Sequence, residues 1–278
     1  MASSLLVLTD FFQPADRALE YAATLAAGLG AHLVLLHVNP DSVLDPDLLT
    51  SQQVAPNRDA EKLALASLKR SLPVPTTAET GNGRVADAVA AAVHRHKPTL
   101  LVLGRPNTDD LPDELVTTTA LELLRAAPGP MLVVPPTVRQ APVPRRVLLA
   151  VDGEPFTLGA HAGPMRHLLD TLGAELTVLH VAAQPAPAAI AAATTAAALA
   201  SVQRTGLLAD LTRPVGTRSL LGARPAEAIL AAAQPSEYDL VVLIARPRSF
   251  WGELFHRSVT AEVLLHSAVP VLVLPAQE

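Results

Sequence analysis

Two stretches of the sequence place hydroxyl side chains where a phosphate-bearing ligand could be held. Residues 100–105 and 239–246 are apolar runs that predict buried strands, and each is followed by a loop and a predicted helix. Both helices open on hydroxyl residues, Thr117 and Thr119 in the first and Ser258 and Thr260 in the second. Such a strand–loop–helix corner is typical of phosphate sites in parallel α/β sheets. The same hydroxyls could instead cap the helices, and we favour this structural role.

Two aspartates stand at the ends of other predicted strands. Asp10 follows the apolar run 5–9, and Asp152 follows the run 147–151. A carboxylate at this place can bind a ligand, and it can equally begin a turn or cap the next helix. Both alternatives stay open.

Other side chains carry weaker signals. Arg105 and Arg246 directly follow their strands and could pair with anionic groups, although solvated arginines are more common. His94 and His96 are two residues apart on a predicted helix and therefore face different ways, so we expect no metal site. The sequence contains no recognisable catalytic nucleophile or base motif, and we expect no enzyme activity.

The composition excludes several classes of protein. Half of the 278 residues are apolar, and the formal net charge of −5 argues against nucleic-acid binding. The chain has no cysteine, which excludes disulfides and thiol catalysis and fits a reducing compartment. The apolar start is short and lacks a basic segment, and the alanine-rich run 188–200 is a poor membrane span. We therefore expect a cytoplasmic protein without membrane contact.

The sequence repeats itself. The segment Leu29-Gly30-Ala31-His32-Leu33-Val34-Leu35-Leu36-His37-Val38 returns as Leu172-Gly173-Ala174-Glu175-Leu176-Thr177-Val178-Leu179-His180-Val181. Arg84-Val85-Ala86-Asp87-Ala88 returns as Arg224-Pro225-Ala226-Glu227-Ala228, and the closing strands 131–134 and 271–274 are both bracketed by prolines. These landmarks recur at an almost constant spacing of about 140 residues, which predicts a tandem duplication.

Within each unit, strand and helix patterns alternate. This alternation predicts parallel sheets built from βαβ crossovers, with about five strands and four helices in each unit. In the first unit the predicted strands are residues 5–9, 33–38, 74–79, 99–103 and 131–134. The predicted helices are residues 14–29, 57–71, 84–96 and 113–126. The second unit repeats this order, with an alanine-rich helix that runs from residue 188 to about Asp210.

The repeat defines two domains. We predict an α/β domain over residues 1–136, a proline-rich linker over 137–145 and a second α/β domain over 146–278. Residues 131–134 and 271–274 are predicted to be sheet edges, and exposed apolar edges invite pairing. We expect these two strands to meet within one chain or across a homodimer. The sequence identifies no other protein partner.

The ordered set of motifs, found twice, resembles the universal stress protein family and its tandem two-domain members. The resemblance covers nearly all of both halves. It implies doubly wound, open, parallel five-stranded sheets of order 3-2-1-4-5, a Rossmann-like fold of the adenine nucleotide alpha hydrolase type. It also implies a ligand site at the switch point between the first and fourth strands.

The resemblance further implies a nucleotide site in which an aspartate meets the adenosine and a glycine-rich motif wraps the phosphates. The positions that match it are Asp10, Gly104, Thr117 and Thr119 in the first half and Asp152, Ser258 and Thr260 in the second. Residues that depart from the motif are Asn107 and Val116 in the first half. In the second half they are Ile244 or Ala245, Arg248 or one of its neighbours, and Arg257. A side chain at a glycine position obstructs the close approach of phosphate.

We therefore expect a non-enzymatic, cytoplasmic stress-response protein with degenerate nucleotide-binding loops and no cofactor. The alternative is a nucleotide-responsive member of this family that holds ATP weakly in one half. The sequence leaves open which stress or pathway the protein serves.

Overall fold

The computed structural model describes residues 3–9, 13–39, 58–106, 119–126, 129–138, 143–246 and 258–277. Over these residues, strands and helices alternate along both halves. The strands of the first half are β1 (Ser4–Thr9), β2 (His32–Asn39), β3 (Thr76–Asn82), β4 (Leu100–Gly104) and β5 (Met131–Val134). Its helices are α1 (Gln13–Leu29), α2 (Arg58–Ser71), α3 (Val85–His96) and α4 (Thr119–Ala126).

The second half repeats this order. Its strands are β6 (Arg146–Val151), β7 (Glu175–Ala182), β8 (Val215–Leu221), β9 (Leu240–Ala245) and β10 (Val271–Pro275). Its helices are α5 (Ala162–Leu172), α6 (Ala188–Arg204), α7 (Pro225–Ala232) and α8 (Val259–His266), and a short 3-10 helix (Gly159–His161) precedes α5.

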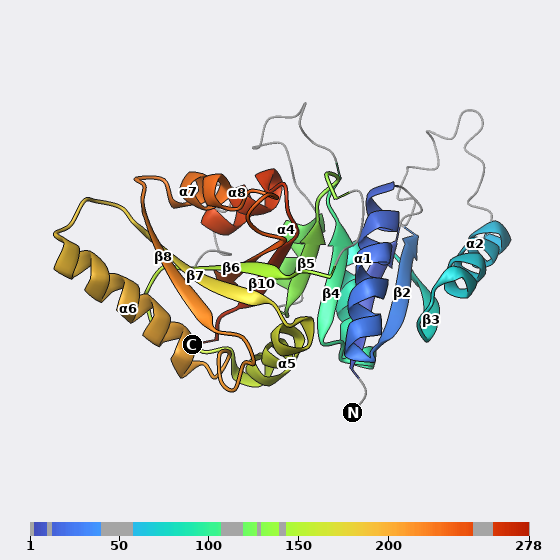
Figure 1. Ribbon diagram of the computed structural model, residues 1–278. Helices are drawn as coiled ribbons and strands as arrows, with labels where there is room; N and C mark the ends of the chain where they lie inside the picture. The colour runs from blue at the N-terminus through green and yellow to red at the C-terminus, as the bar shows by residue number, and fades with distance from the viewer. Residues whose placement is uncertain are drawn as a thin grey trace, which may run out of the picture.

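The ten strands form one continuous sheet (Figure 1). Its order is β3-β2-β1-β4-β5-β10-β9-β6-β7-β8, so each half has the order 3-2-1-4-5 and is internally parallel. The predicted fold class is confirmed. The switch point of each half lies where its first strand pairs with its fourth, as in the pairing of Leu148 with Val241.

The two halves join through their last strands. β5 and β10 pair antiparallel within this chain, with Val271 opposite Val133, Leu272 opposite Leu132 and Val273 opposite Met131. β5 and β10 are the edge strands of their own five-stranded units, and by pairing they come to lie in the middle of the ten-stranded sheet. All residues of both strands are buried, because helices cover both faces at this junction.

The core consists of two layers, one on each face of the sheet. Alternate residues of β1 point to opposite layers: Leu5 and Val7 pack with α1, and Leu6 packs with α3 and α4. Helices α1, α5 and α6 contribute to the first layer, with α2 at its margin, and α3, α4, α7 and α8 contribute to the second. Burial on both faces explains why the strands read as continuous apolar runs.

Glycines mark two places where the repeat needs them. Gly30 and Gly173 end α1 and α5 with φ of 59° and 58°, a left-handed conformation that favours glycine. Gly81 lies near the end of β3, against α3, where an added Cβ would lie 2.8 Å from the Cβ of Ala88. Gly222 has the same close relationship to Ala228, at 3.0 Å.

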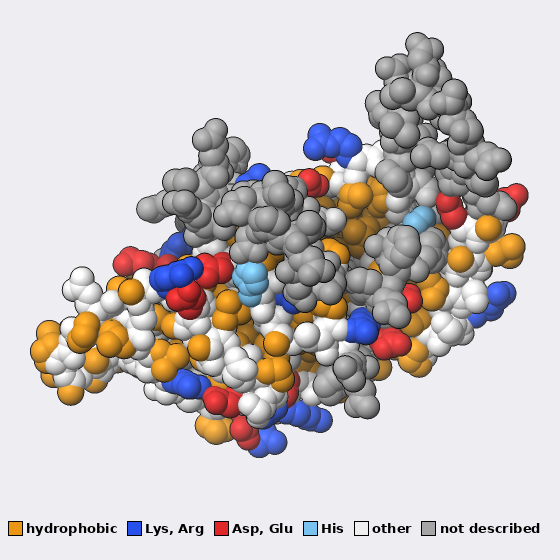
Figure 2. Space-filling model, turned by 90° about the horizontal axis from the view of Figure 1, so that it is seen from above, with side chains coloured by type: hydrophobic (Ala, Val, Ile, Leu, Met, Phe, Trp, Pro, Cys, Tyr) orange, Lys and Arg blue, Asp and Glu red, His pale blue; other side chains and the backbone are white. Residues whose placement is uncertain are grey.

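The predicted helix over residues 188–210 is too long. Helix α6 ends at Arg204, and residues 205–210 form turns that include Gly206 with φ of 76°. The N-terminal half of α6 stands away from the sheet, and Figure 2 shows hydrophobic side chains gathered at this end of the molecule, on the left. Ile190 is 54% exposed there.

Smaller differences concern strand ends. The third strand begins at Thr76 and continues to Asn82, whereas the sequence pattern predicts residues 74–79. The start of the fourth predicted helix, residues 113–118, lies outside the described residues, as do residues 139–142 of the predicted linker. Over the described ranges, every helix is too short or too polar to cross a membrane.

Candidate functional site

A cavity of about 440 Å³ lies at the switch point of the second half. Its volume falls within the range of small-molecule sites. The described residues that line it come from the carboxyl ends of three strands and from two helices: Ala150, Val151, Asp152, Val181, Leu243, Ile244, Arg246, Pro225, Ile229, Ser258, Val259 and Thr260. Parallel strands of order β7-β6-β9 bring these ends together, which is where doubly wound sheets place their ligands.

Asp152 and Arg246 form an ion pair in the wall of this cavity. The Nε and Nη2 atoms of Arg246 donate to Oδ2 and Oδ1 of Asp152, each at 2.7 Å. The guanidinium also donates to the carbonyl oxygens of Pro155, at 3.1 Å, and Glu154, at 2.9 Å. It lies 6.0 Å from the centre of the Phe156 ring. The side chain is therefore fixed on several sides.

Asp152 also holds the turn that follows β6. Its Oδ1 accepts a hydrogen bond from the backbone N–H of Glu154 at 3.0 Å, an arrangement typical of an Asp that begins a turn. Partial burial alone raises the pKa of Asp152, but hydrogen bonds and charge from Arg246, together with the Glu154 amide, lower this pKa below its ordinary value. Asp152 is thus a carboxylate with both oxygens already bonded within the protein.

Helix α8 supplies the hydroxyl side of the cavity. Ser258 is its N-cap, and the Ser258 Oγ accepts a hydrogen bond from the backbone N–H of Ala261 at 3.1 Å. Thr260 is buried in the first turn of the helix. Ser258 therefore has the structural role that the sequence favours, while its side chain still borders the cavity.

The equivalent corner of the first half is described only in part. Gly104 ends β4, and Thr119 is the exposed first residue of α4. Asp10 and Thr117 lie outside the described residues. Four residues that depart from the family motif also lie outside the described residues: Asn107, Val116, Arg248 and Arg257. Ile244 and Ala245 are described and end β9.

The structure corrects the expectation that the two strand-end arginines are solvated. Arg246 holds Asp152, as described above, and Arg105 is only 8% exposed. The Nη1 of Arg105 donates to the carbonyl oxygen of Leu264 in α8, at 2.9 Å, and so links the two halves. Because β6 neighbours β9, the residues that follow these two strands lie near each other, so the sequence carried a signal for the Asp152–Arg246 pair.

Three histidines make contacts within the fold. The Nδ1 atoms of His37 and His180 lie 2.9 Å and 3.4 Å from the carbonyl oxygens of Thr9 and Val151, on neighbouring strands. The Nε2 of His96 lies 3.0 Å from Oε2 of Glu79. Within the described ranges, no group of three or more His, Asp or Glu residues is arranged to hold a metal ion.

Sequence reasoning missed the apolar wall of the cavity. Val181 lies near the carboxyl end of β7. Pro225 and Ile229 come from α7, which packs against β7. Apolar side chains carry no chemical signature of a ligand, because the same residue types fill the core.

The fold and the position of this cavity define a tandem, doubly wound α/β protein with a cavity at a switch point. Residues 1–135 and residues 144–275 each match the Universal stress protein family, and the chain belongs to this family. The family expected from the sequence is thereby confirmed. None of the curated proteins matches the chain.

Three solved structures share the whole fold. A universal stress protein from Archaeoglobus fulgidus DSM 4304 is 17% identical, with a TM-score of 0.70 over 98% of each chain. A functionally unknown protein from Pseudomonas aeruginosa PAO1 is 18% identical, with a TM-score of 0.64 over 99% of this chain and 93% of that one. A putative universal stress protein from Pseudomonas aeruginosa UCBPP-PA14 has the same identity and TM-score, over 99% and 94%.

Proposed function

We propose that this protein is a non-enzymatic, cytoplasmic stress-response protein whose second-half pocket has lost tight nucleotide binding. The observation that carries this proposal is the bidentate ion pair between Asp152 and Arg246. In the family, the equivalent aspartate meets the adenosine of a bound nucleotide. Here Arg246 occupies both carboxylate oxygens, so a ligand must compete with a charge-assisted hydrogen-bonded pair.

The chemistry of the pocket also argues for binding rather than catalysis. Its described lining contains two ionisable side chains, Asp152 and Arg246, and these neutralise each other. The hydroxyl oxygen of Ser258 already accepts a bond from a helix amide, and both oxygens of Asp152, the one carboxylate of the described lining, are bonded to Arg246. This arrangement offers no activated nucleophile.

A second candidate is a nucleotide-responsive protein that holds ATP weakly in this half. The open volume of about 440 Å³ favours it, because an apolar wall and a helix N-terminus remain available to a base and to phosphate. Under this alternative, ATP displaces Arg246 from Asp152 when it binds.

Calorimetry with ATP and Mg²⁺ distinguishes the two candidates. The proposal predicts binding no tighter than about 0.1 mM, and no ATP hydrolysis above background. Micromolar binding that Asp152→Ala abolishes would support the nucleotide-responsive alternative. Asp87→Ala, an exposed change on α3, is the control for the effect of removing a negative charge.

A further inference from the structure

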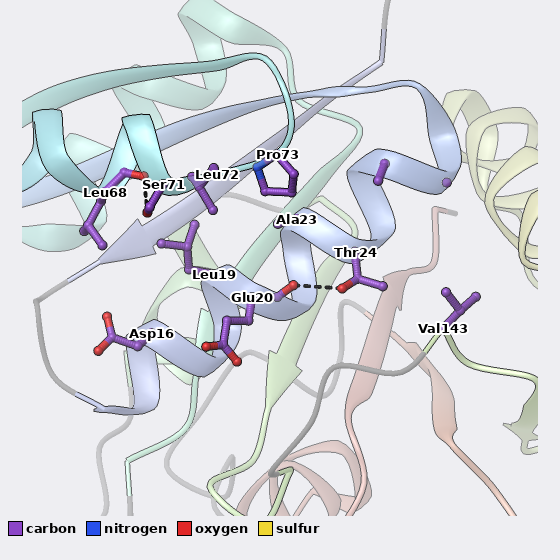
Figure 3. Close-up of a pocket in the computed structure, with 12 residues that line it drawn as sticks. Asp16, Leu19, Glu20, Ala23, Thr24, Leu68, Ser71, Leu72, Pro73 and Val143 are labelled. Carbon is purple, nitrogen blue, oxygen red and sulfur yellow. Dashed lines mark hydrogen bonds between the residues drawn. The ribbon is translucent and has the colours of Figure 1, made fainter.

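A second and larger cavity lies outside the switch point. It is a groove of about 890 Å³ between α1 and the C-terminal end of α2 (Figure 3). Its apolar lining in the described residues includes Leu19, Ala23, Ala27, Leu68, Leu72 and Val143. Leu19 points toward Leu68 and Leu72, whereas Asp16 and Glu20 lie near the N-terminal end of α1. The family site described above uses none of these residues.

The groove exists because one connection is short. β3 and β8 begin at the same register, since Thr76 pairs with Leu33 and Val215 pairs with the equivalent Leu176. In the first half, only residues 72–75 connect α2 to β3. In the second half, residues 205–214 connect α6 to β8, so this half has more chain at the same place.

In the second half, this additional chain covers the equivalent helix surface. Because α1 and α5 end alike at Gly30 and Gly173, Ala23 corresponds to Arg166 and Ala27 corresponds to Asp170. The backbone N–H of Thr212 donates to Oδ1 of Asp170 at 3.1 Å. Nη1 of Arg166 lies 3.9 Å from Oδ2 of Asp210. The covering segment thus contacts both positions that are alanines in the groove, through a hydrogen bond at Asp170 and an exposed ion pair at Arg166.

The same segment shows which side chains suit this surface. Leu207 is fully buried, and Leu208 and Leu211 pack partly buried against the core layer below. In α1, the small side chains of Ala23 and Ala27 leave this surface open. The duplication thus provides an internal example of a leucine-bearing peptide seated on this helix face.

The charge of the groove differs from that of the second half. Asp16 and Glu20 are exposed carboxylates in its lining, and no Lys, Arg or His occurs among the described lining residues. Glu20 lies one helical turn before Ala23 and on the same face of α1. A positive side chain on a seated peptide, at the place of Asp210, would therefore lie within reach of Glu20.

From these contacts we infer that the groove is a docking site for a peptide segment of a partner protein. The segment carries leucines that cover the apolar lining of the groove between α1 and α2. It also carries a lysine or arginine opposite Glu20. Apolar burial supplies the affinity and the carboxylates select the charge of the partner. This site is independent of the nucleotide pocket and of the proposed function.

Two labelled peptides test the inference by fluorescence anisotropy with the full chain. One has the sequence of residues 205–214, and the other has the same sequence with Asp210→Lys. We expect the lysine peptide to bind more tightly than the unmodified one. Glu20→Lys in the protein should weaken the lysine peptide by at least about tenfold and should strengthen the unmodified peptide.

Two further variants keep the test decisive. Asp87→Lys makes the same charge change on α3, on the opposite face of the sheet, and should leave both affinities unchanged. Ala27→Arg places a long side chain in the groove and should weaken both peptides. The inference is wrong if neither peptide binds folded protein at about 1 mM. It is equally wrong if Asp87→Lys and Glu20→Lys have the same effect.

Discussion

Arg105 and Arg246 follow equivalent strands, and both guanidinium groups make hydrogen bonds within the second half. Arg246 turns into its own half and pairs with Asp152, with both N–O distances at 2.7 Å. Arg105 reaches into the other half and donates to the Leu264 carbonyl at 2.9 Å. Leu264 belongs to α8, whose first residues line the second-half cavity. The first half thus supports a helix that shapes the pocket of the second.

Replacing Arg105 should weaken the junction between the halves. Arg105→Met keeps much of the apolar stem but removes the donor to a carbonyl near the C-terminal end of α8, where helical partners run out. We expect the free energy of unfolding to fall by about 2 kcal/mol in urea titrations. The exposed Arg204→Ala should change it by less than about 0.5 kcal/mol. Equal effects of the two changes would contradict this role.

Two glycines should respond in opposite directions to alanine. A Cβ at Gly81 would lie 2.8 Å from the Cβ of Ala88, so β3 or α3 must shift, and we expect a loss of about 1–3 kcal/mol. Gly28 lies within α1, and an added Cβ there meets nothing within 4 Å. Gly28→Ala should raise the free energy of unfolding by about 0.5–1 kcal/mol. Thermal and urea unfolding of both variants checks the signs.

A buried tyrosine should be replaceable without loss. Tyr21 is 2% exposed, and its hydroxyl has no hydrogen-bond partner among the described residues. Burial, with a smaller effect from Asp239, raises the pKa of this hydroxyl. Tyr21→Phe removes an unsatisfied polar group and should leave stability unchanged or raise it by about 1 kcal/mol.

The control for this change is the other tyrosine. The hydroxyl of Tyr238 lies near the Arg218 guanidinium and contributes to the raised pKa of Arg218, so Tyr238→Phe should lower the free energy of unfolding by up to about 1 kcal/mol. Equal destabilisation by Tyr21→Phe and Tyr238→Phe would mean that the hydroxyl of Tyr21 makes a stabilising hydrogen bond in the folded protein.

Acid should weaken the start of β6. Asp239 accepts hydrogen bonds from the backbone N–H groups of Arg145 and Arg146, at 2.9 and 3.0 Å, and pairs with the Arg146 guanidinium at 2.6 Å. Partial burial raises the pKa of Asp239, but the bonds to Arg146 and to both amides outweigh this and lower the pKa. The resulting stability is present above the unfolded pKa of about 3.9 and is lost as pH falls through the lower folded value.

Asp239→Asn isolates this contribution. The difference in free energy of unfolding between the wild type and the variant should be large at neutral pH and should shrink as pH falls toward about 3. Urea titrations at several pH values measure it. A difference that is constant over this range would mean that the charge of Asp239 contributes nothing.

The sequence predicted the fold because the strands are apolar on both faces and because each landmark occurs twice. The Leu-Gly-Ala segments and the proline-bracketed strands located the elements within a few residues. The helix predicted from the sequence extends beyond the end of α6, because residues 205–210 continue its apolar pattern. In the structure these residues form turns, and Gly206 has a positive φ. Local pattern alone does not reveal such a turn.

The candidate site was predicted in part. Asp152, Ser258 and Thr260 line one cavity, as their places at strand and helix ends imply. Val181 and Ile229 were missed because apolar wall residues resemble core residues. The groove along α1 was not predicted at all. It depends on the different lengths of two connections, which the sequence shows but whose consequence appears only when α1 and α5 are compared in space.

The most direct test of the account compares ATP binding by the wild type and by Arg246→Ala in calorimetry with Mg²⁺. The variant frees both oxygens of Asp152, and the account predicts that it binds ATP at least about tenfold more tightly than the wild type. The double variant Asp152→Ala with Arg246→Ala should lose this gain. Equal or weaker binding by Arg246→Ala would contradict the claim that the ion pair between Asp152 and Arg246 restricts the pocket.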